Sequence, residues 1–206
     1  MNPNIIFADL PKVPSLAKAH GIAMGIAFVV LFPLGAFLIR FVRSKHAIWI
    51  HAGCQLVGWV LMIAGLATGI KMGKILDRLH NNAHTILGTV VVVALLLQPA
   101  FGYLHHLRYV KTQKKNVWTH LHVWYGRVLI VLGIINGGLG LRLARDTPAY
   151  SMAGTIVYAV FAGVFGGFFF GLVVYVVMRG RKSNEAGLRS GKVEKLGGGG
   201  KNGEGP

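Results

Sequence analysis

Residues 83–104 read AHTILGTVVVVALLLQPAFGYL, and this stretch decides the class of the protein. It contains no Asp, Glu, Lys or Arg, and at about 1.5 Å per residue it is long enough to cross a hydrocarbon core about 30 Å thick. The whole chain has the same character, because 53% of its 206 residues are apolar and its mean hydropathy is +0.56. The sequence therefore predicts a membrane protein rather than a soluble domain.

Four further apolar stretches of similar length accompany the first. Asn81 and Asn82 are predicted helix N-caps before the quoted stretch, and Pro99 is a predicted kink inside it. Thr147 and Pro148 are interpreted as the N-cap and first turn of the last stretch. The predicted fold class is an all-α, polytopic membrane helical bundle. Its expected spans are residues 17–41, 47–70, 83–104, 117–141 and 148–178.

The net charge of +16 raises the question of nucleic acid, but the basic residues lie in the connections between apolar spans and after the last one. This distribution indicates membrane topology instead. Fourteen basic residues fall in the first and third connections and the C-terminal tail, against seven on the other side. The positive-inside rule then predicts an extracytosolic N-terminus and a cytosolic C-terminus. Residues 1–16 are the expected extracytosolic segment, and the basic, Gly-rich tail at 179–206 is expected to be disordered.

Cysteine and leader signals add little. Cys54 is the single cysteine, which excludes a disulfide within the chain and any cluster held by several thiolates. The first fifteen residues contain no continuous apolar stretch, so no cleavable signal peptide is expected.

Four of the nine histidines lie about one turn inside the start of the first four spans, one in each. An ionisable side chain within a membrane helix is costly and usually faces the bundle interior with a functional partner. The other five lie near loop edges and are interpreted as interfacial or solvated side chains. The four inside the spans are His20, His51, His84 and His122, and the five near loops are His46, His80, His105, His106 and His120.

Alternating helix directions predict how the four inner histidines pair. The first and third spans begin on the outer side, so His20 and His84 are expected at one level near that surface. The second and fourth begin on the inner side, so His51 and His122 share the other level. A pair of neutral imidazoles is a good axial ligand set for haem iron and favours electron transfer over oxygen chemistry. The sequence thus predicts two haems, each held by histidines of two helices.

Small and polar residues accompany these histidines. Gly88 and Gly126 follow His84 and His122 by four residues, so they are predicted to lie one turn deeper and to leave room for a flat porphyrin. Arg127 is a candidate partner for a haem propionate or an anionic substrate, with a structural hydrogen bond to backbone as the alternative.

Two amides stand fourteen residues after two of the histidines. Gln98 and Asn136 occupy the positions at which flavin-linked ferric reductases carry a second histidine. Two roles are open for them, namely hydrogen bonding near the opposite haem and ordinary hydrogen bonding between helices.

Taken in order, the motifs resemble the cytochrome b561 and ferric reductase transmembrane domain, in the variant found after DOMON domains. The resemblance covers about residues 17–178. The motifs are His20 to Met24 with Pro33, Gly35 and Arg40; His51 with Gln55, Gly58 and Trp59; His84 with Gly88, Gln98, Pro99 and Gly102; and Trp118, His122, Gly126 and Arg127 with Asn136 and Gly140.

The resemblance implies a four-helix core with two haem b groups, ligated by the same two histidine pairs, and here at least one peripheral helix. It implies a transmembrane oxidoreductase that carries electrons from a cytosolic reductant such as ascorbate to an extracytosolic acceptor such as a ferric chelate or monodehydroascorbate. The family commonly has six helices and five are counted here. No DOMON domain precedes the first span, so if the protein uses a DOMON-type partner in place of a small extracytosolic acceptor, another chain must supply that partner.

Two other functions stay open at this point. One is a haem-bearing membrane anchor for a separate redox partner. The other is a histidine-dependent proton or metal transporter, which is disfavoured because the expected spans contain no Asp or Glu. The lipid bilayer is the expected surrounding, nucleic acid is excluded as a partner, and a homodimer is left open.

Overall fold

The computed structural model describes residues 4–145 and 147–197, and within these ranges the regular structure is entirely helical. The chain divides into two compact units, residues 1–166 and residues 167–206. The elements of the first unit are η1 (Phe7–Lys12), α1 (Val13–Gly25), η2 (Ile26–Leu31), α2 (Phe32–Phe41), α3 (Ala47–Ile75), α4 (Ala83–Leu95), α5 (Gln98–Thr112), α6 (Val117–His120), η3 (Leu121–Tyr125), α7 (Gly126–Ala144), α8 (Met152–Phe161) and η4 (Ala162–Gly166).

Five helical segments in the described part of the chain are long and apolar enough to cross a membrane. The predicted polytopic helical bundle is thereby confirmed. Large apolar side chains on these segments face outward, for example Val90 and Val93 on α4, each more than half exposed, as a lipid-facing surface requires. The five segments are Phe7–Phe41, Ala47–Ile75, Ala83–Thr112, Val117–Ala144 and Met152–Lys182.

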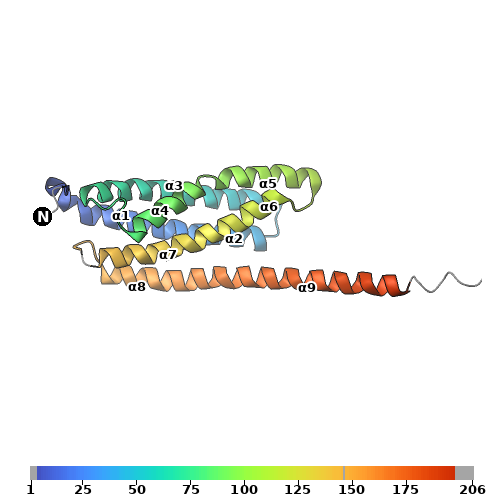
Figure 1. Ribbon diagram of the computed structural model, residues 1–206. Coiled ribbons are helices and arrows are strands. Elements are labelled where there is room, and N and C mark those ends of the chain that lie inside the picture. Colours follow the sequence, from blue (N-terminus) through green and yellow to red (C-terminus); the bar gives the residue numbers. More distant parts are fainter. Residues whose placement is uncertain (1–3, 146, 198–206) are drawn as a thin grey trace, which may run out of the picture. The chain divides into compact units, whose positions relative to one another are not determined.

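The first four segments form two antiparallel helical hairpins. In one hairpin, α1, η2 and α2 pack along α3; in the other, α4 packs on α7 and α5 packs on α6 and η3. The two hairpins meet where α1 and η2 contact α7 (Figure 1). This arrangement is a four-helix core in which side chains from both hairpins face one another.

The middle of this core is closed by aromatic packing against glycine. Phe28 and Phe32 pack edge to face with their ring centroids 5.2 Å apart, and both are almost fully buried. Gly133 of α7 lies against the ring of Phe28, and Gly58 of α3 lies against the ring of Phe32. A side chain at either glycine would collide with a phenyl ring, so the close approach of these helices depends on their absence.

Local signals set the boundaries of the third segment. Asn82 is the N-cap of α4, since its side chain accepts a hydrogen bond of 3.0 Å from the backbone N–H of Thr85. The third segment is interrupted just before Pro99, where a kink was predicted, because α4 ends at Leu95 and α5 begins three residues later, at Gln98. The predicted cap at Asn82 is confirmed, whereas the kink predicted at Pro99 takes the form of an interruption of the helix before it.

The start of the fifth segment was predicted wrongly. Thr147 and the proline after it were expected to begin the helix, but α8 begins at Met152. The Thr147 hydroxyl instead donates to the carbonyl of Ala144, at the end of α7. Ser151 provides the N-cap, because its hydroxyl accepts a backbone N–H at 3.1 Å. Both Thr147 and Ser151 are good N-cap residues. Because the Thr147 hydroxyl bonds to the end of α7, Ser151 caps α8 instead.

The second unit contains helix α9 (Gly167–Gly197). We expected disorder from Arg179 onward, whereas the described backbone stays helical to Gly197. Lys, Arg, Glu and Leu make up ten of the nineteen residues from 179 to 197 and are good helix formers, which favours a helix here. The rest of the expected tail, residues 198–206, lies outside the described residues.

Candidate functional site

Four histidines from four helical segments meet as two pairs inside the bundle. His20 of α1 faces His84 of α4, with ring centroids 5.8 Å apart and ring planes at 88°. His51 of α3 faces His122 of η3, with centroids 6.3 Å apart and planes at 87°. Each pair joins one histidine from each hairpin. The structure therefore brings together the two pairs that helix direction predicted.

Three of these imidazoles are held by main-chain carbonyl groups of a neighbouring helix. A carbonyl oxygen can only accept, so the Nδ1 atom of each ring must carry the proton. The Nε2 atom is then left with its lone pair, which is the form that binds a metal ion. The bonds run from His20 Nδ1 to Gly65 (2.8 Å), from His51 Nδ1 to Gly35 (2.8 Å) and from His84 Nδ1 to Asn136 (3.0 Å).

The geometry of the pairs fits haem iron. An iron atom bound to two imidazole nitrogens at about 2 Å on opposite sides places the ring centroids about 6 to 6.5 Å apart, close to both observed separations. Among the described residues, no group of three or more His, Cys, Asp or Glu side chains is placed to hold a metal ion alone. Two protein ligands suffice only where another group, such as a porphyrin, provides the remaining ones.

Glycines on the opposing helices provide the space for the imidazoles. At three glycines, an added Cβ atom would lie within about 3 Å of a histidine ring atom, which is closer than van der Waals contact allows. The pairs are Gly69 with His20 Nδ1 (2.8 Å), Gly140 with His84 Cε1 (2.8 Å) and Gly102 with His122 Cε1 (3.0 Å).

A repeated pattern in the second hairpin explains two of these contacts. His84, Gly88, Gln98 and Gly102 recur at the same spacing as His122, Gly126, Asn136 and Gly140. Because the two segments are antiparallel, the glycine that ends each pattern lies against the histidine that begins the other. This repeat was a signal in the sequence from which the positions of Gly102 and Gly140 could have been found.

Gly88 and Gly126 lie opposite the two amides of the repeat. A Cβ atom at Gly88 would be 2.8 Å from Asn136 Nδ2, and one at Gly126 would be 3.0 Å from Gln98 Nε2. Gln98 Nε2 also donates to the carbonyl of His122 at 3.2 Å. The amides are thus interhelical groups at the level of the opposite histidine pair, while a contact of the two glycines with porphyrin stays a prediction.

Arg127 lies just beyond His122, at the start of α7. Its guanidinium carbon lies 4.9 Å from the ring centroid of Trp124, which is a cation–π contact. The predicted role of Arg127 toward a propionate or an anionic substrate stays a prediction.

His105 is a residue whose position the sequence did not reveal. We expected it at a loop edge, but α5 continues to Thr112 and carries His105 inside the helix. Its ring is nearly parallel to that of His122, with centroids 6.0 Å apart and an angle of 18°. A third span extended beyond Leu104 would have predicted this position, because His105 would then follow Gly102 by three residues on the same helix.

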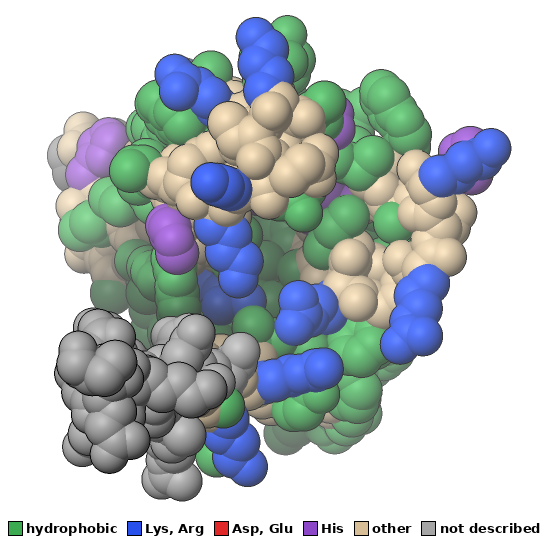
Figure 2. Space-filling view, turned by 90° about the vertical axis from the view of Figure 1, so that its right-hand side faces the viewer, with side chains coloured by type: hydrophobic (Ala, Val, Ile, Leu, Met, Phe, Trp, Pro, Cys, Tyr) green, Lys and Arg blue, Asp and Glu red, His purple; other side chains and the backbone are tan. Residues whose placement is uncertain are grey.

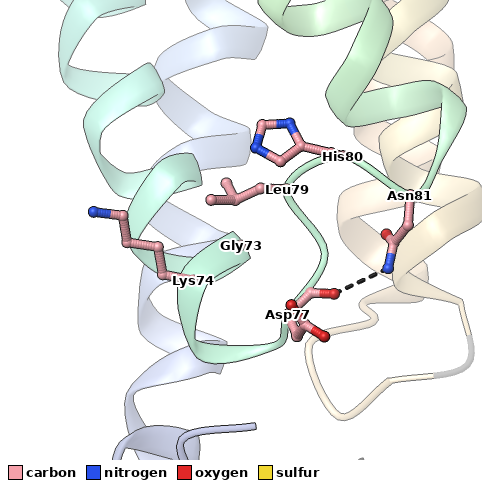
Figure 3. A pocket seen from close by; sticks show the side chains of 6 residues that line it. All are labelled: Gly73, Lys74, Asp77, Leu79, His80 and Asn81. Atoms are coloured by element: carbon pink, nitrogen blue, oxygen red, sulfur yellow. Dashed lines mark hydrogen bonds between the residues drawn. The ribbon is translucent and has the colours of Figure 1, made fainter. Parts of the chain in front are cut away.

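The two ends of the bundle differ in their polar surroundings. Near the His20–His84 pair, the turn after α3 and the end of that helix line a cavity of about 370 Å³ (Figure 3). Its lining residues are Gly73, Lys74, Asp77, Leu79, His80 and Asn81. Gly73 is one helical turn from Gly69, which faces His20, so the cavity lies close to that pair.

The other end carries basic side chains. Figure 2 shows Lys and Arg side chains around this end and no acidic side chain on the face in view. Seven exposed basic residues come from the end of α2 and the turn before α3, and from the end of α5 and the turn before α6. They are Arg40, Arg43, Lys45, Arg108, Lys111, Lys114 and Lys115, and we call them the basic end.

Comparison with known proteins gives a consistent result. A cytochrome b561 and DOMON domain-containing protein of Arabidopsis thaliana is 30% identical over 178 residues, covering 79% of this chain and 41% of the relative. A second plant protein of the same description is 29% identical over 131 residues, covering 62% of this chain and 32% of the relative. A cytochrome b561 domain-containing protein of the same plant is 27% identical over 157 residues, covering 72% and 59%. The chain thus spans between about a third and three fifths of these relatives.

No solved structure matches the chain significantly. A family model described as eukaryotic cytochrome b561 matches residues 19–145, which contain all four paired histidines and make up more than half of the chain. The chain is therefore an integral, multi-pass membrane protein that belongs to the eukaryotic cytochrome b561 family, a family that binds b-type haem and transfers electrons across membranes.

Proposed function

We propose that this chain carries electrons through two haem b groups, one held by His20 and His84 and the other by His51 and His122. The observation that carries the proposal is the meeting of two imidazoles at each site, at the separation that one iron atom between them requires. A metal transporter would need exchangeable ligands along its path. Two separate two-histidine sites held by main-chain hydrogen bonds fit a resident cofactor better.

Bound haem supplies the one-electron chemistry of its iron, and the side chains assigned here bind and orient it rather than act as catalytic residues. The donated Nδ1 protons of His20, His51 and His84 fix the tautomer of each ring and raise the basicity of its Nε2 atom. Two imidazoles at each site would hold one haem from both sides, an arrangement that would favour electron transfer over oxygen chemistry.

The distance between the two sites suits electron transfer without a moving part. Asn136, whose carbonyl holds His84, lies fourteen positions after His122, or about 21 Å along an α-helix. Along the helices, Phe28 and Phe32 lie between His20 and Gly35, and Met62 lies between His51 and Gly65; all three side chains are buried. These apolar groups exclude water from the middle of the bundle, so the electron passes through a dry protein interior.

The charge pattern suggests where donor and acceptor bind. We place the basic end in the cytosol, in agreement with the positive-inside rule, beside the His51–His122 pair. Its positive field attracts an anionic reductant such as ascorbate. The cavity beside the His20–His84 pair then faces the extracytosolic side, where the His80 imidazole offers an N–H donor to an acceptor such as a ferric chelate or monodehydroascorbate (Figure 3).

A second function, a haem-bearing anchor for a redox partner, is favoured by the relatives whose names include a DOMON domain. In that case the electron leaves the His20–His84 site to a DOMON-type partner rather than to a small acceptor.

The test is a reduced-minus-oxidised difference spectrum of the purified full chain, combined with the ratio of haem to protein. We expect b-type bands and two haems per chain. His84→Ala and His122→Ala should each lose one haem and keep the other, while His46→Ala, which alters an exposed histidine before α3, should keep both. Two haems in both ligand variants would contradict the proposal.

Addition of ascorbate separates the two functions. Reduction of both haems in the absence of any partner supports the complete electron path from a small reductant. If ascorbate reduces neither haem while a chemical reductant does, the anchor function is favoured.

A further inference from the structure

His122 differs from the other three paired histidines in how its ring is held. His20, His51 and His84 each donate an Nδ1 proton to a backbone carbonyl group. The Nδ1 atom of His122 is buried and has no hydrogen-bond partner. No hydrogen bond therefore fixes the rotation of this imidazole about its Cβ–Cγ bond, so another contact must set its plane.

The side chains around His122 supply one contact of the right kind. The ring of His51 meets the His122 ring nearly at right angles, at 87°, so it does not stack on either face of the His122 ring. Gly102 has no side chain with which to hold the His122 ring. The ring of His105 lies at 18° to that of His122, with centroids 6.0 Å apart, so it is the aromatic group aligned with the His122 plane.

His105 is itself fixed by the segment that carries His122. Its Nδ1 atom lies 3.0 Å from the hydroxyl oxygen of Thr119, at hydrogen-bond distance. That oxygen also accepts the backbone N–H of Asn116 at 3.2 Å, and the Asn116 side chain accepts the N–H of Thr119 at 3.1 Å, which completes a capping box. The capping box at the start of α6 thus also holds His105 in place.

The segment after this cap is unusual as well. His122 lies in η3 (Leu121–Tyr125), a π-helical turn between α6 and α7, and such turns are frequent at functional sites. A π turn shifts the side chains that follow it relative to an α-helix. Thr119 and His122 therefore lie in one short segment, and His105 of the neighbouring helix α5 contacts both of them.

We propose that His105 is a positioning residue for His122: it sets the plane of this imidazole, and Thr119 holds His105 in place. The inference rests on the proposed function, in which His122 ligates haem. His105 does not bind the iron in this arrangement. It replaces the carbonyl hydrogen bond that holds each of the other three rings.

The test compares His105→Ala, His105→Phe and Thr119→Val with His106→Ala, which removes the next histidine on the same helix. Electron paramagnetic resonance of the oxidised full chain reads the angle between the two imidazole planes at each haem. Transfer of haem to a competing apoprotein reads how fast each haem is lost. Both measurements separate a change in ligand orientation from a general loss of folding.

We expect His105→Ala to shift the resonance of one haem and to release that haem about three- to tenfold faster, the range for loss of one aromatic pair. The other haem should be unchanged. His105→Phe keeps a flat ring and should recover the normal resonance in large part, Thr119→Val should give an intermediate shift, and His106→Ala should match the unaltered chain.

Failure of the inference differs from failure of the proposed function. If His122→Ala removes a haem while His105→Ala behaves like His106→Ala, His105 does not position the ligand. If His105→Ala removes a haem that His122→Ala retains, His105 is the ligand and the inference is overturned. If His51→Ala and His122→Ala both keep two haems, the haem assignment itself has failed.

Discussion

Replacement of Gly140 by Ala should weaken haem binding at the His20–His84 site specifically. The added Cβ atom would lie 2.8 Å from Cε1 and 3.1 Å from Nδ1 of His84. The His84 ring must therefore move, or α7 must move away from α4. Either movement disturbs the 3.0 Å hydrogen bond from His84 to the carbonyl of Asn136, which lies one turn earlier on the same helix.

The structure supports an estimate of this effect. Overpacking by one methyl group costs about 1–3 kcal/mol, and loss of the hydrogen bond costs about 0.5–1.5 kcal/mol. Alanine regains about 1 kcal/mol over glycine in a helix, which leaves a net cost of about 0.5–3.5 kcal/mol. That corresponds to about 2- to 300-fold weaker haem binding at this site.

Gly138→Ala is the matched control, because Gly138 is exposed on the same helix and a Cβ atom there would have nothing within 4 Å. Haem occupancy is measured by stoichiometry at limiting haem, and the affected site is identified by comparison with His84→Ala. We expect Gly140→Ala to lower haem occupancy at the same site as His84→Ala, but to a smaller extent. Equal haem affinity in the two alanine variants would refute the argument from glycine contacts.

Three further predictions follow from single contacts. Tyr158→Phe removes a 2.6 Å hydrogen bond from the phenol to the carbonyl of Ile134, so thermal unfolding in detergent should show a loss of about 0.5–1.5 kcal/mol with both haems retained. Asn82→Ala removes the N-cap of α4 and should cost about 1 kcal/mol, whereas Asn82→Asp should keep most of this stability in the same assay. Gly133→Val should prevent the close packing of α7 on the Phe28 ring and lower the yield of folded protein and of both haems together.

The sequence was sufficient for the parts of the fold that depend on hydropathy and helix direction. Long apolar stretches have one good solution in a bilayer, which is a helix that satisfies its own backbone. Five spans, the cap at Asn82 and a distortion of the third span at Pro99 follow from that rule and from local chemistry. Because successive spans alternate in direction, one histidine near the start of each was enough to predict which histidines meet.

Only the tertiary structure decided how each helix is rotated about its axis and what faces each imidazole. It placed Gly102 and Gly140, rather than Gly88 and Gly126, against histidine rings, and it brought His105 beside His122. Hydropathy cannot fix such rotations, because apolar side chains surround most of each membrane helix and its lipid-facing and core-facing sides look alike in sequence. The rotation is set by the packing of small residues against rings across the bundle, which becomes defined only when the hairpins meet.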